Sequence, residues 1–323
     1  MIAKRCIAIL GGGPAGLSAA LWLRNLGFEP CVLDAAERPG GMQNLNFLAN
    51  DWVLGQTGQT GPALAARFVD HVVSDGVQIR TGIRPVRLEG TAGAFRLQLS
   101  DGSPLDCIAV LVATGTRYRA EEVLTAVAVI SDIPRERIAY GPHAFAELGA
   151  LAGQRVLIIG GGDNAYENAR LLAPVAAMVH IAIRSQPRAQ QGLVAAVAVE
   201  EAAGHCRVLC PAVVESMAST SASIEVTLAV SDQRERFEVD RVHVLAGYKP
   251  NTAFLREILP TEVYGRLRFD GQDYLIVDTG GRSGVPGLYA AGDICNPRFP
   301  CVVSALAQGA MTAKTIEMDT RPK

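Results

Sequence analysis

The sequence predicts an α/β protein with two Rossmann-like nucleotide-binding domains. Two glycine fingerprints, near residues 11 and 160, each follow an apolar strand pattern and begin a helical pattern. The 323 residues are enough for two domains, each with its own core. Hydrophobic residues make up 49% and charged residues 19%, a balance typical of a packed globular protein.

The first fingerprint lies in the stretch IAILGGGPAGLSAALWLRNLGFEPCVLD, residues 7–34. Its three glycines are Gly11, which permits the tight turn, Gly13, which lets the backbone approach a pyrophosphate, and Gly16, which lets the helix pack on the strand. Asp34 ends the next predicted strand, where an acid meets a ribose 2′-hydroxyl. The strand, helix and acid in register favour an FAD or NAD site.

The second fingerprint has the form G-x-G-x-x-A, with Gly160, Gly162 and Ala165. The strand after its helix ends in Arg184, and Arg188 follows four residues later. Arginine at this place favours a ribose 2′-phosphate, so this site is predicted to take NADPH. Two nucleotide sites on one chain indicate electron transfer between two cofactors.

Composition excludes several other classes of function. The formal net charge of −2 gives no basic field for nucleic acid, and no apolar run reaches about eighteen residues, so no membrane span is expected. Histidines and cysteines lack metal-ligand spacing, so no metal is expected. Seven cysteines without a dense pattern predict a reducing cytosol. Three of them, Cys6, Cys31 and Cys107, lie in apolar strand-like runs, where packing is the default.

Seven motifs follow one another along the chain: GGGPAG (11–16), GGM (40–42), DWVLGQTGQTGP (51–62), VATG (112–115), GGGDNAYENA (160–169), GYKPNT (247–252) and GLYAAGD (287–293). In this order they resemble the low-molecular-weight thioredoxin reductases and their relatives, including the ferredoxin–NADP reductases of the same fold. The resemblance implies three-layer ββα domains. It also implies that an NAD(P)-type domain, residues 118–245, is inserted into an FAD domain made of residues 1–117 and 246–323.

The fingerprints and the resemblance together give the candidate cofactor contacts. The FAD set is Gly11, Gly13, Pro14, Ala15, Gly16, Asp34, Gly40, Gly41, Met42, Gln43, Asp51, Ala113, Thr114, Gly115, Gly292, Asp293, Cys301 and Val302. The NADPH set is Gly160, Gly162, Asp163, Asn164, Ala165, Arg184 and Arg188. The resemblance implies an FAD-dependent oxidoreductase that passes electrons from NADPH to an external acceptor. That acceptor is a ferredoxin-like or thioredoxin-like partner or a small molecule, and the protein is expected to be a homodimer.

One family feature is missing. Thioredoxin reductases carry a C-x-x-C before the second fingerprint, whereas residues 138–148 of this chain contain no cysteine. The usual relay from flavin to thioredoxin therefore cannot run through that segment. Cys295 and Cys301, beside the expected flavin edge, are the candidate replacement, and packing of Cys301 as a small apolar residue is the favoured interpretation.

Three alternatives stay open. The first is a disulfide oxidoreductase that uses Cys295 and Cys301. The second is a ferredoxin-linked flavoenzyme whose second site holds another nucleotide, such as a second FAD. GGGDNAYEN (160–168) departs from the more usual GGGNSAxEE form, and the segment with Arg184 and Arg188 lacks the double arginine typical of NADPH users. The carboxylates Asp163 and Glu167 would also repel a phosphate. The third is a non-enzymatic binding or sensor protein that retains FAD for its structure.

Overall fold

The computed structural model describes residues 5–50, 52–125, 127, 129–142 and 148–321. The chain divides into two compact units. Unit 1 comprises Met1–Arg117 and Lys249–Lys323, and unit 2, Tyr118–Tyr248, is inserted between these two segments of the chain. The chain returns to unit 1 at Lys249.

Unit 1 is built around a parallel sheet. Its elements are β1 (Cys6–Leu10), α1 (Pro14–Asn25), β2 (Glu29–Leu33), the 3-10 helix η1 (Gly41–Leu45), β3 (Ala49–Asn50), β4 (Gln59–Thr60), α2 (Gly61–Ser74), β5 (Gln78–Arg80), β6 (Pro85–Thr91), β7 (Ala94–Leu99), β8 (Pro104–Cys107), β9 (Ala109–Val112), α6 (Phe254–Ile258), α7 (Thr261–Tyr264), β21 (Leu288–Ala290) and α8 (Val302–Asp319). Five strands pair in the order β21-β9-β1-β2-β5, all parallel, and β6-β7-β8 form an antiparallel meander.

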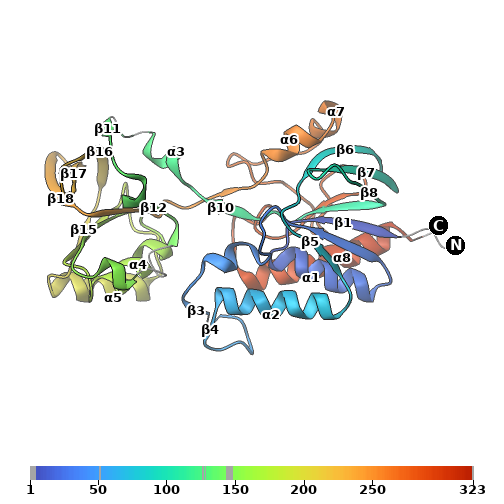
Figure 1. The fold of residues 1–323 in the computed structure, drawn as a ribbon, viewed down its shortest axis with the longest axis horizontal. Coiled ribbons are helices and arrows are strands. Elements are labelled where there is room, and N and C mark those ends of the chain that lie inside the picture. Colours follow the sequence, from blue (N-terminus) through green and yellow to red (C-terminus); the bar gives the residue numbers. More distant parts are fainter. Residues whose placement is uncertain (1–4, 51, 126, 128, 143–147, 322–323) are drawn as a thin grey trace. The chain divides into compact units, whose positions relative to one another are not determined.

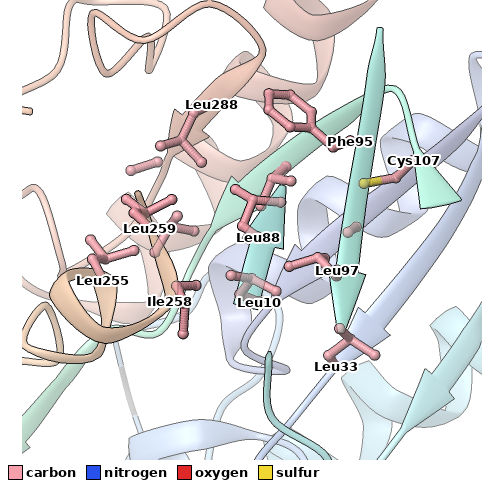
Figure 2. Close-up of a cluster of buried hydrophobic side chains, with 14 of the residues drawn as sticks. Leu10, Leu33, Leu88, Phe95, Leu97, Cys107, Leu255, Ile258, Leu259 and Leu288 are labelled. Carbon is pink, nitrogen blue, oxygen red and sulfur yellow. The ribbon is translucent and has the colours of Figure 1, made fainter. Parts of the chain in front are cut away.

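The layers of unit 1 follow from the apolar residues of β1. Ile7 and Ile9 pack on the side of helices α1, α2 and α8, whereas Ala8 and Leu10 pack on the side of the meander (Figure 1). A parallel strand covered on both faces needs such a continuous apolar run. Figure 2 shows the core on the meander side, in which Leu10 lies among side chains such as Leu97.

Unit 2 repeats the same three layers. Its elements are α3 (Glu121–Leu124), β11 (Val129–Ser131), η2 (Arg135–Arg137), β12 (Ile138–Tyr140), η4 (Leu148–Leu151), β13 (Arg155–Ile159), α4 (Asp163–Leu172), β14 (Met178–Ala182), α5 (Gln191–Ala202), β15 (Cys206–Leu209), β16 (Ala212–Ser219), β17 (Ile224–Val230), β18 (Gln233–Val239) and β19 (Arg241–Val244). A parallel sheet, β12-β19-β13-β14-β15, has helices α4 and α5 on one side and the sheet β11-β16-β17-β18 on the other.

At the two crossings between the units, β10 (Thr116–Tyr118) and β20 (Tyr248–Pro250) pair with each other. The predicted fold class, two Rossmann-like ββα domains with one inserted into the other, is confirmed. In both parallel sheets the central strand, β1 or β13, runs straight into a glycine fingerprint. Ligands of such sheets bind at the carboxyl ends of the strands, so these two turns are the candidate binding places.

Candidate functional site

The first glycine turn follows β1 and is closed by backbone contacts. Gly11 has φ +109°, and a Cβ there would strike the carbonyl oxygen of Ala113 at the end of β9. A Cβ at Gly16 would strike the carbonyl oxygen of Gly11. Both positions therefore require glycine, for the reasons that the fingerprint predicts: a tight turn and a close helix.

Asp34 lies just beyond β2 and holds this turn in place. Its Oδ2 accepts a hydrogen bond from the Gly12 N–H at 2.7 Å, and its Oδ1 accepts one from the Ala36 N–H at 2.8 Å. The carboxylate thus lies against the glycine turn, where the fingerprint expects a ribose contact. Its hydrogen bonds orient the amide of Gly12.

A second loop faces the first turn. The Gly40 N–H donates to the Gly12 carbonyl oxygen at 2.8 Å, and a Cβ on Gly41 would lie 3.2 Å from the Gly13 Cα. Gly40 and Gly41 both have positive φ, +123° and +57°. Because these glycines have no side chains, a ligand can approach the backbone of both segments closely, which suits a diphosphate. Met42 and Gln43 follow in η1, whereas Asp51 lies outside the described residues.

Unit 1 also contains buried hydrogen-bond acceptors that need a donor. Among the described residues, Gln43 Oε1, Asn44 Oδ1, Gln56 Oε1 and Asp293 Oδ1 are buried without a hydrogen-bond partner. Gln43 and Asn44 lie in η1, which begins at Gly41, and Asp293 lies three residues after β21. Buried acceptors of this kind are rare in native proteins. A flavin nucleotide carries hydroxyl and ring N–H donors, so these residues fit FAD.

The segment after β21 brings Asp293 next to the first turn. A Cβ on Gly292 would lie 2.7 Å from the Ala15 Cβ, so the segment touches the start of α1. The Gly292 N–H donates to Gln308 Oε1 at 2.8 Å. Burial raises the pKa of Asp293 from 3.8 to about 6. The buried carboxyl thus favours a partner that donates to it.

Cys301 has a structural part in this region. It is the N-cap of α8, and its Sγ accepts the Ser304 N–H at 3.4 Å while the Cys301 N–H donates to Ser304 Oγ at 3.3 Å. Val302 packs with Val53 and Leu64. The thiol thus acts as a capping side chain.

Cys295 is held differently. Its Sγ donates to the Gly292 carbonyl oxygen at 3.3 Å, and burial raises the pKa of this thiol to about 12. A thiol that resists deprotonation is a poor nucleophile. Both cysteines of the candidate redox pair are free thiols in this structure.

The crossing segment Ala113–Gly115 is clamped by a residue that the sequence pattern does not single out. Asn251 Nδ2 donates to the Thr114 carbonyl oxygen at 2.8 Å, and Thr114 Oγ1 donates to the Asn251 carbonyl oxygen at 3.0 Å. The Asn251 N–H also donates to the Gly115 carbonyl oxygen at 2.9 Å. These bonds fix the end of β9 beside the glycine turn. The only signal for Asn251 is its place in the motif GYKPNT.

The second glycine turn, in unit 2, repeats the construction of the first. Gly160 has φ +151°, and a Cβ there would strike the carbonyl oxygen of Leu245 after β19. A Cβ on Gly162 would meet no atom within 4 Å. Gly162 is the N-cap of α4, so no side chain caps the start of this helix. The space and the amides at this helix start fit a nucleotide phosphate.

The loop after β14 folds onto this turn. The Arg188 N–H donates to the Gly161 carbonyl oxygen at 2.7 Å. Gln190 donates twice to Asp163: its N–H to Oδ1 at 2.8 Å and its Nε2 to Oδ2 at 3.1 Å. The side chains of Arg184 and Arg188 are exposed beside the turn. The carboxylate of Asp163 is thus held by the loop, and the two arginines are accessible to a ligand.

A tyrosine pair lies at the start of α4. The rings of Tyr118 and Tyr248 are 5.0 Å apart, and Asn164 Nδ2 donates to Tyr248 Oη at 2.6 Å. Burial, and then the neighbouring Tyr248, raise the pKa of Tyr118. Burial, and then the Asp163 carboxylate, raise the pKa of Glu167. A polar cluster of hydroxyl, amide and carboxyl groups therefore adjoins the second turn, and the two tyrosines in it were not predicted.

The segment without the dithiol packs against this pair. Gly141 has φ +86°, and a Cβ there would lie 2.7 Å from Tyr118 Cδ2. The aromatic ring thus contacts the segment 138–148, which contains no cysteine. Residues 143–147 of the segment lie outside the described part of the chain.

Neither a metal cluster nor a membrane-spanning helix occurs in the described ranges. No group of three or more His, Cys, Asp or Glu side chains in this part of the chain is arranged to hold a metal ion. None of the helices formed by the described residues is long and apolar enough to cross a membrane.

Comparison with known proteins agrees with this geometry. The family model described as pyridine nucleotide-disulphide oxidoreductase matches residues 5–309. The F component of alkyl hydroperoxide reductase from Xanthomonas campestris pv. phaseoli is 29% identical over 318 residues, which are 95% of this chain and 55% of the relative. An NADH dehydrogenase of Bacillus subtilis (strain 168) is 28% identical over 308 residues, 95% of this chain and 57% of the relative. The chain thus spans little more than half the length of these relatives.

Solved structures show the same fold at full length. The crystal structure of T. acidophilum thioredoxin reductase has a TM-score of 0.82 at 24% identity and covers 98% of this chain and 99% of its own. The match runs through both units and both glycine turns.

Proposed function

Because the chain belongs to the pyridine nucleotide-disulphide oxidoreductase family, we propose that it is an FAD-dependent oxidoreductase that uses NADPH and reduces an external acceptor. FAD belongs to unit 1 and NADPH to unit 2. When bound, the two cofactors supply the redox chemistry, a hydride passed from the nicotinamide to the flavin. The protein's own residues bind, orient and shield them.

The observation that carries the proposal is the set of unpartnered acceptors beside the first turn. Gln43, Asn44 and Asp293 each bury an oxygen without a donor among the described residues. A second glycine turn of the same construction leaves room at Gly162 and has two exposed arginines next to it. The buried acceptors beside the first turn need a nucleotide with many hydrogen-bond donors, which supports FAD there. The arginines beside the second turn can bind a phosphate, which supports NADPH there.

The acceptor is proposed to take electrons directly from the flavin. The segment 138–148 has no cysteine, and Cys295 and Cys301 are engaged in structural contacts. A one-electron protein partner of the ferredoxin kind, a thioredoxin-like protein or a small molecule remain the candidate acceptors. A homodimer in the cytosol remains a prediction, which light scattering and localisation of the tagged protein would test.

The experiment compares arginine variants on two nicotinamide nucleotides. Arg184→Ala and Arg188→Ala should each raise KM for NADPH by about tenfold or more, because a charged contact to phosphate contributes about 1.5–3 kcal/mol. KM for NADH should stay unchanged, with ferricyanide as the acceptor. Arg207→Ala is the matched control, since Arg207 is an exposed arginine of β15 that pairs with Glu235 at 2.6 Å. Equal losses for NADPH and NADH would contradict the assignment of unit 2.

A second candidate has its own supporting observation. Asp163 and Glu167 place two carboxyl groups on the first turns of α4, and their mutual repulsion contributes to the raised pKa of Glu167. Negative charge there disfavours the phosphates of NADPH. A second FAD in unit 2, with a reduced ferredoxin as donor, is the function that would follow. The number of flavins released per chain separates it from the first proposal.

A further inference from the structure

Cys6, Cys31 and Cys107 are among the fifteen residues that line a pocket of about 810 Å³ in unit 1. It lies at the end of the sheet where β1 begins, since Cys6 is the first residue of that strand. The glycine turn follows the other end of β1, at Leu10. The pocket is therefore separate from the proposed flavin site.

The three thiols lie on the same face of the parallel sheet. Cys31 and Cys107 belong to the buried core on the meander side, and Cys6 packs against that core. Figure 2 shows Cys107 in this core, on the strands of the meander. Cys295 packs against the same core, so four of the chain's seven cysteines gather in one layer of unit 1.

Cys6 and Cys107 are closely connected through the backbone. The Ile108 N–H, directly after Cys107, donates to the Cys6 carbonyl oxygen at 2.9 Å. Neighbouring strands lie about 4.8 Å apart, and a disulfide spans Cα separations of about 4.4–6.8 Å. Because Ile7 pairs with Ala109, the register places Ile108 opposite Cys6, so Cys107 is one position away from Cys6 and its Cα lies within the span that a disulfide allows. Cys31, on β2, lies opposite Ala8 rather than opposite Cys6.

The two thiols differ in access. Cys6 is partly exposed in the pocket, whereas the side chain of Cys107 is buried. Burial raises the pKa of Cys107 to about 12, and Cys6 is the next largest cause. An oxidant in the pocket would therefore meet Cys6 first, and Cys107 lies behind it as the second thiol.

We propose that Cys6 and Cys107 form a reversible disulfide when hydrogen peroxide enters this pocket, at a redox site separate from the flavin. The Cys6 sulfur attacks one peroxide oxygen, the O–O bond breaks, and a sulfenic acid and one water form. The Cys107 thiol then loses its proton and its sulfur attacks the Cys6 sulfur, the S–S bond forms, and the sulfenic oxygen leaves as a second water. Because burial raises the pKa of Cys107, this second step is the slow one. The two sulfurs lose two electrons together, and the peroxide gains them. The bond ties the start of β1 to β8, and it does not depend on the proposed function.

The test is a peptide map of the whole protein after treatment with a small excess of hydrogen peroxide. Alkylation and non-reducing digestion should give a peptide with Cys6 linked to a peptide with Cys107, which dithiothreitol separates. A thiol titration should show two fewer thiols per chain. Cys6→Ser and Cys107→Ser should abolish the linked peptide. Cys210→Ser, which removes a thiol of unit 2 that donates to the Ser185 carbonyl oxygen, should retain it.

The peptide map of the wild-type protein tests the Cys6–Cys107 link even if Cys107→Ser fails to fold. A link between Cys6 and Cys31, a Cys6 sulfinic acid without any link, or seven intact thiols would each overturn the proposal. Cys6→Ala gives a second variant at the more exposed position, where substitution disturbs packing least. Its thiol count should not fall with peroxide.

Discussion

Replacing Asp293 by Asn should stabilise the FAD-free protein at neutral pH and weaken its binding of FAD. Burial raises the pKa of this carboxyl from 3.8 to about 6. A difference of about two pKa units corresponds to about 3 kcal/mol. Since the folded state holds the proton more tightly than the unfolded state, stability falls as the pH rises from about 4 to about 6. Above that window the ionised carboxylate destabilises the apo protein by the full amount.

Asn has nearly the same shape as Asp and carries no charge. Asp293→Asn should therefore raise the free energy of unfolding by up to about 3 kcal/mol at about pH 7.5 and by almost nothing at about pH 4. The same variant should bind FAD about tenfold or more weakly, because a hydrogen bond to a charged acceptor contributes about 1.5–3 kcal/mol. Stability of the apo protein and affinity for the cofactor should thus change in opposite directions.

Urea unfolding of FAD-stripped protein, followed by tryptophan fluorescence, measures this effect. Both tryptophans of the chain, Trp22 and Trp52, belong to unit 1, so the signal reports on the unit that holds Asp293. Asp34→Asn is the matched control and should be destabilising, because the Asp34 carboxylate accepts two backbone N–H bonds. The reasoning would be refuted if Asp293→Asn raised the free energy of unfolding equally at both pH values, or lowered it at about pH 7.5.

Three further predictions concern the turns and the cap of α8. Gly162→Ala should change stability by less than about 0.5 kcal/mol, because a Cβ there meets no atom within 4 Å, yet it should weaken NADPH binding measured by fluorescence titration. Gly16→Ala should instead destabilise unit 1 by about 1–3 kcal/mol in urea unfolding, since its Cβ would strike the Gly11 carbonyl oxygen; equal stability of the two variants would argue against the turn geometry. Cys301→Ala should lower the free energy of unfolding by about 1 kcal/mol, because the helix cap is lost. Cys301→Ser should retain both the stability and the turnover with NADPH and ferricyanide. A serine variant without turnover would instead support a redox role for Cys301.

Much of the fold was predictable because its signals are local. The apolar run Ile7–Leu10, the spacing of the glycines and the acid at Asp34 lie within one stretch of sequence, and the structure brings them together at one sheet edge. The second fingerprint predicts its strand, turn and helix for the same reason. Turns of this type need particular residues at particular positions, so the pattern carries the geometry.

The contacts that complete the two sites were not predictable from local patterns. Asn251 clamps Thr114 across 137 positions of the chain, and Gln190 holds Asp163 across 27. Tyr118 meets Tyr248 only because the chain leaves unit 1 and returns at neighbouring strands. Such pairs depend on which segments the fold brings together, and no spacing rule encodes them.

At Cys301 a local sequence pattern suggests a chemical role, whereas the structure shows a capping contact. A cysteine at a helix N-terminus is the pattern of a reactive thiol. In the structure its sulfur accepts the Ser304 N–H and closes a capping box, so it occupies the place that serine or threonine usually takes. The capping contact could not be predicted from the sequence pattern, because it depends on the positions of the backbone atoms.

The most direct test of two different cofactors on one chain is an anaerobic titration of the purified, FAD-loaded protein with NADPH. Flavin absorbance is followed at each addition, and the flavin released from the same sample is counted per chain. The account predicts one flavin per chain and full bleaching with one equivalent of NADPH. Two flavins per chain, or flavin that stays oxidised in excess NADPH, would contradict the assignment of NADPH to unit 2.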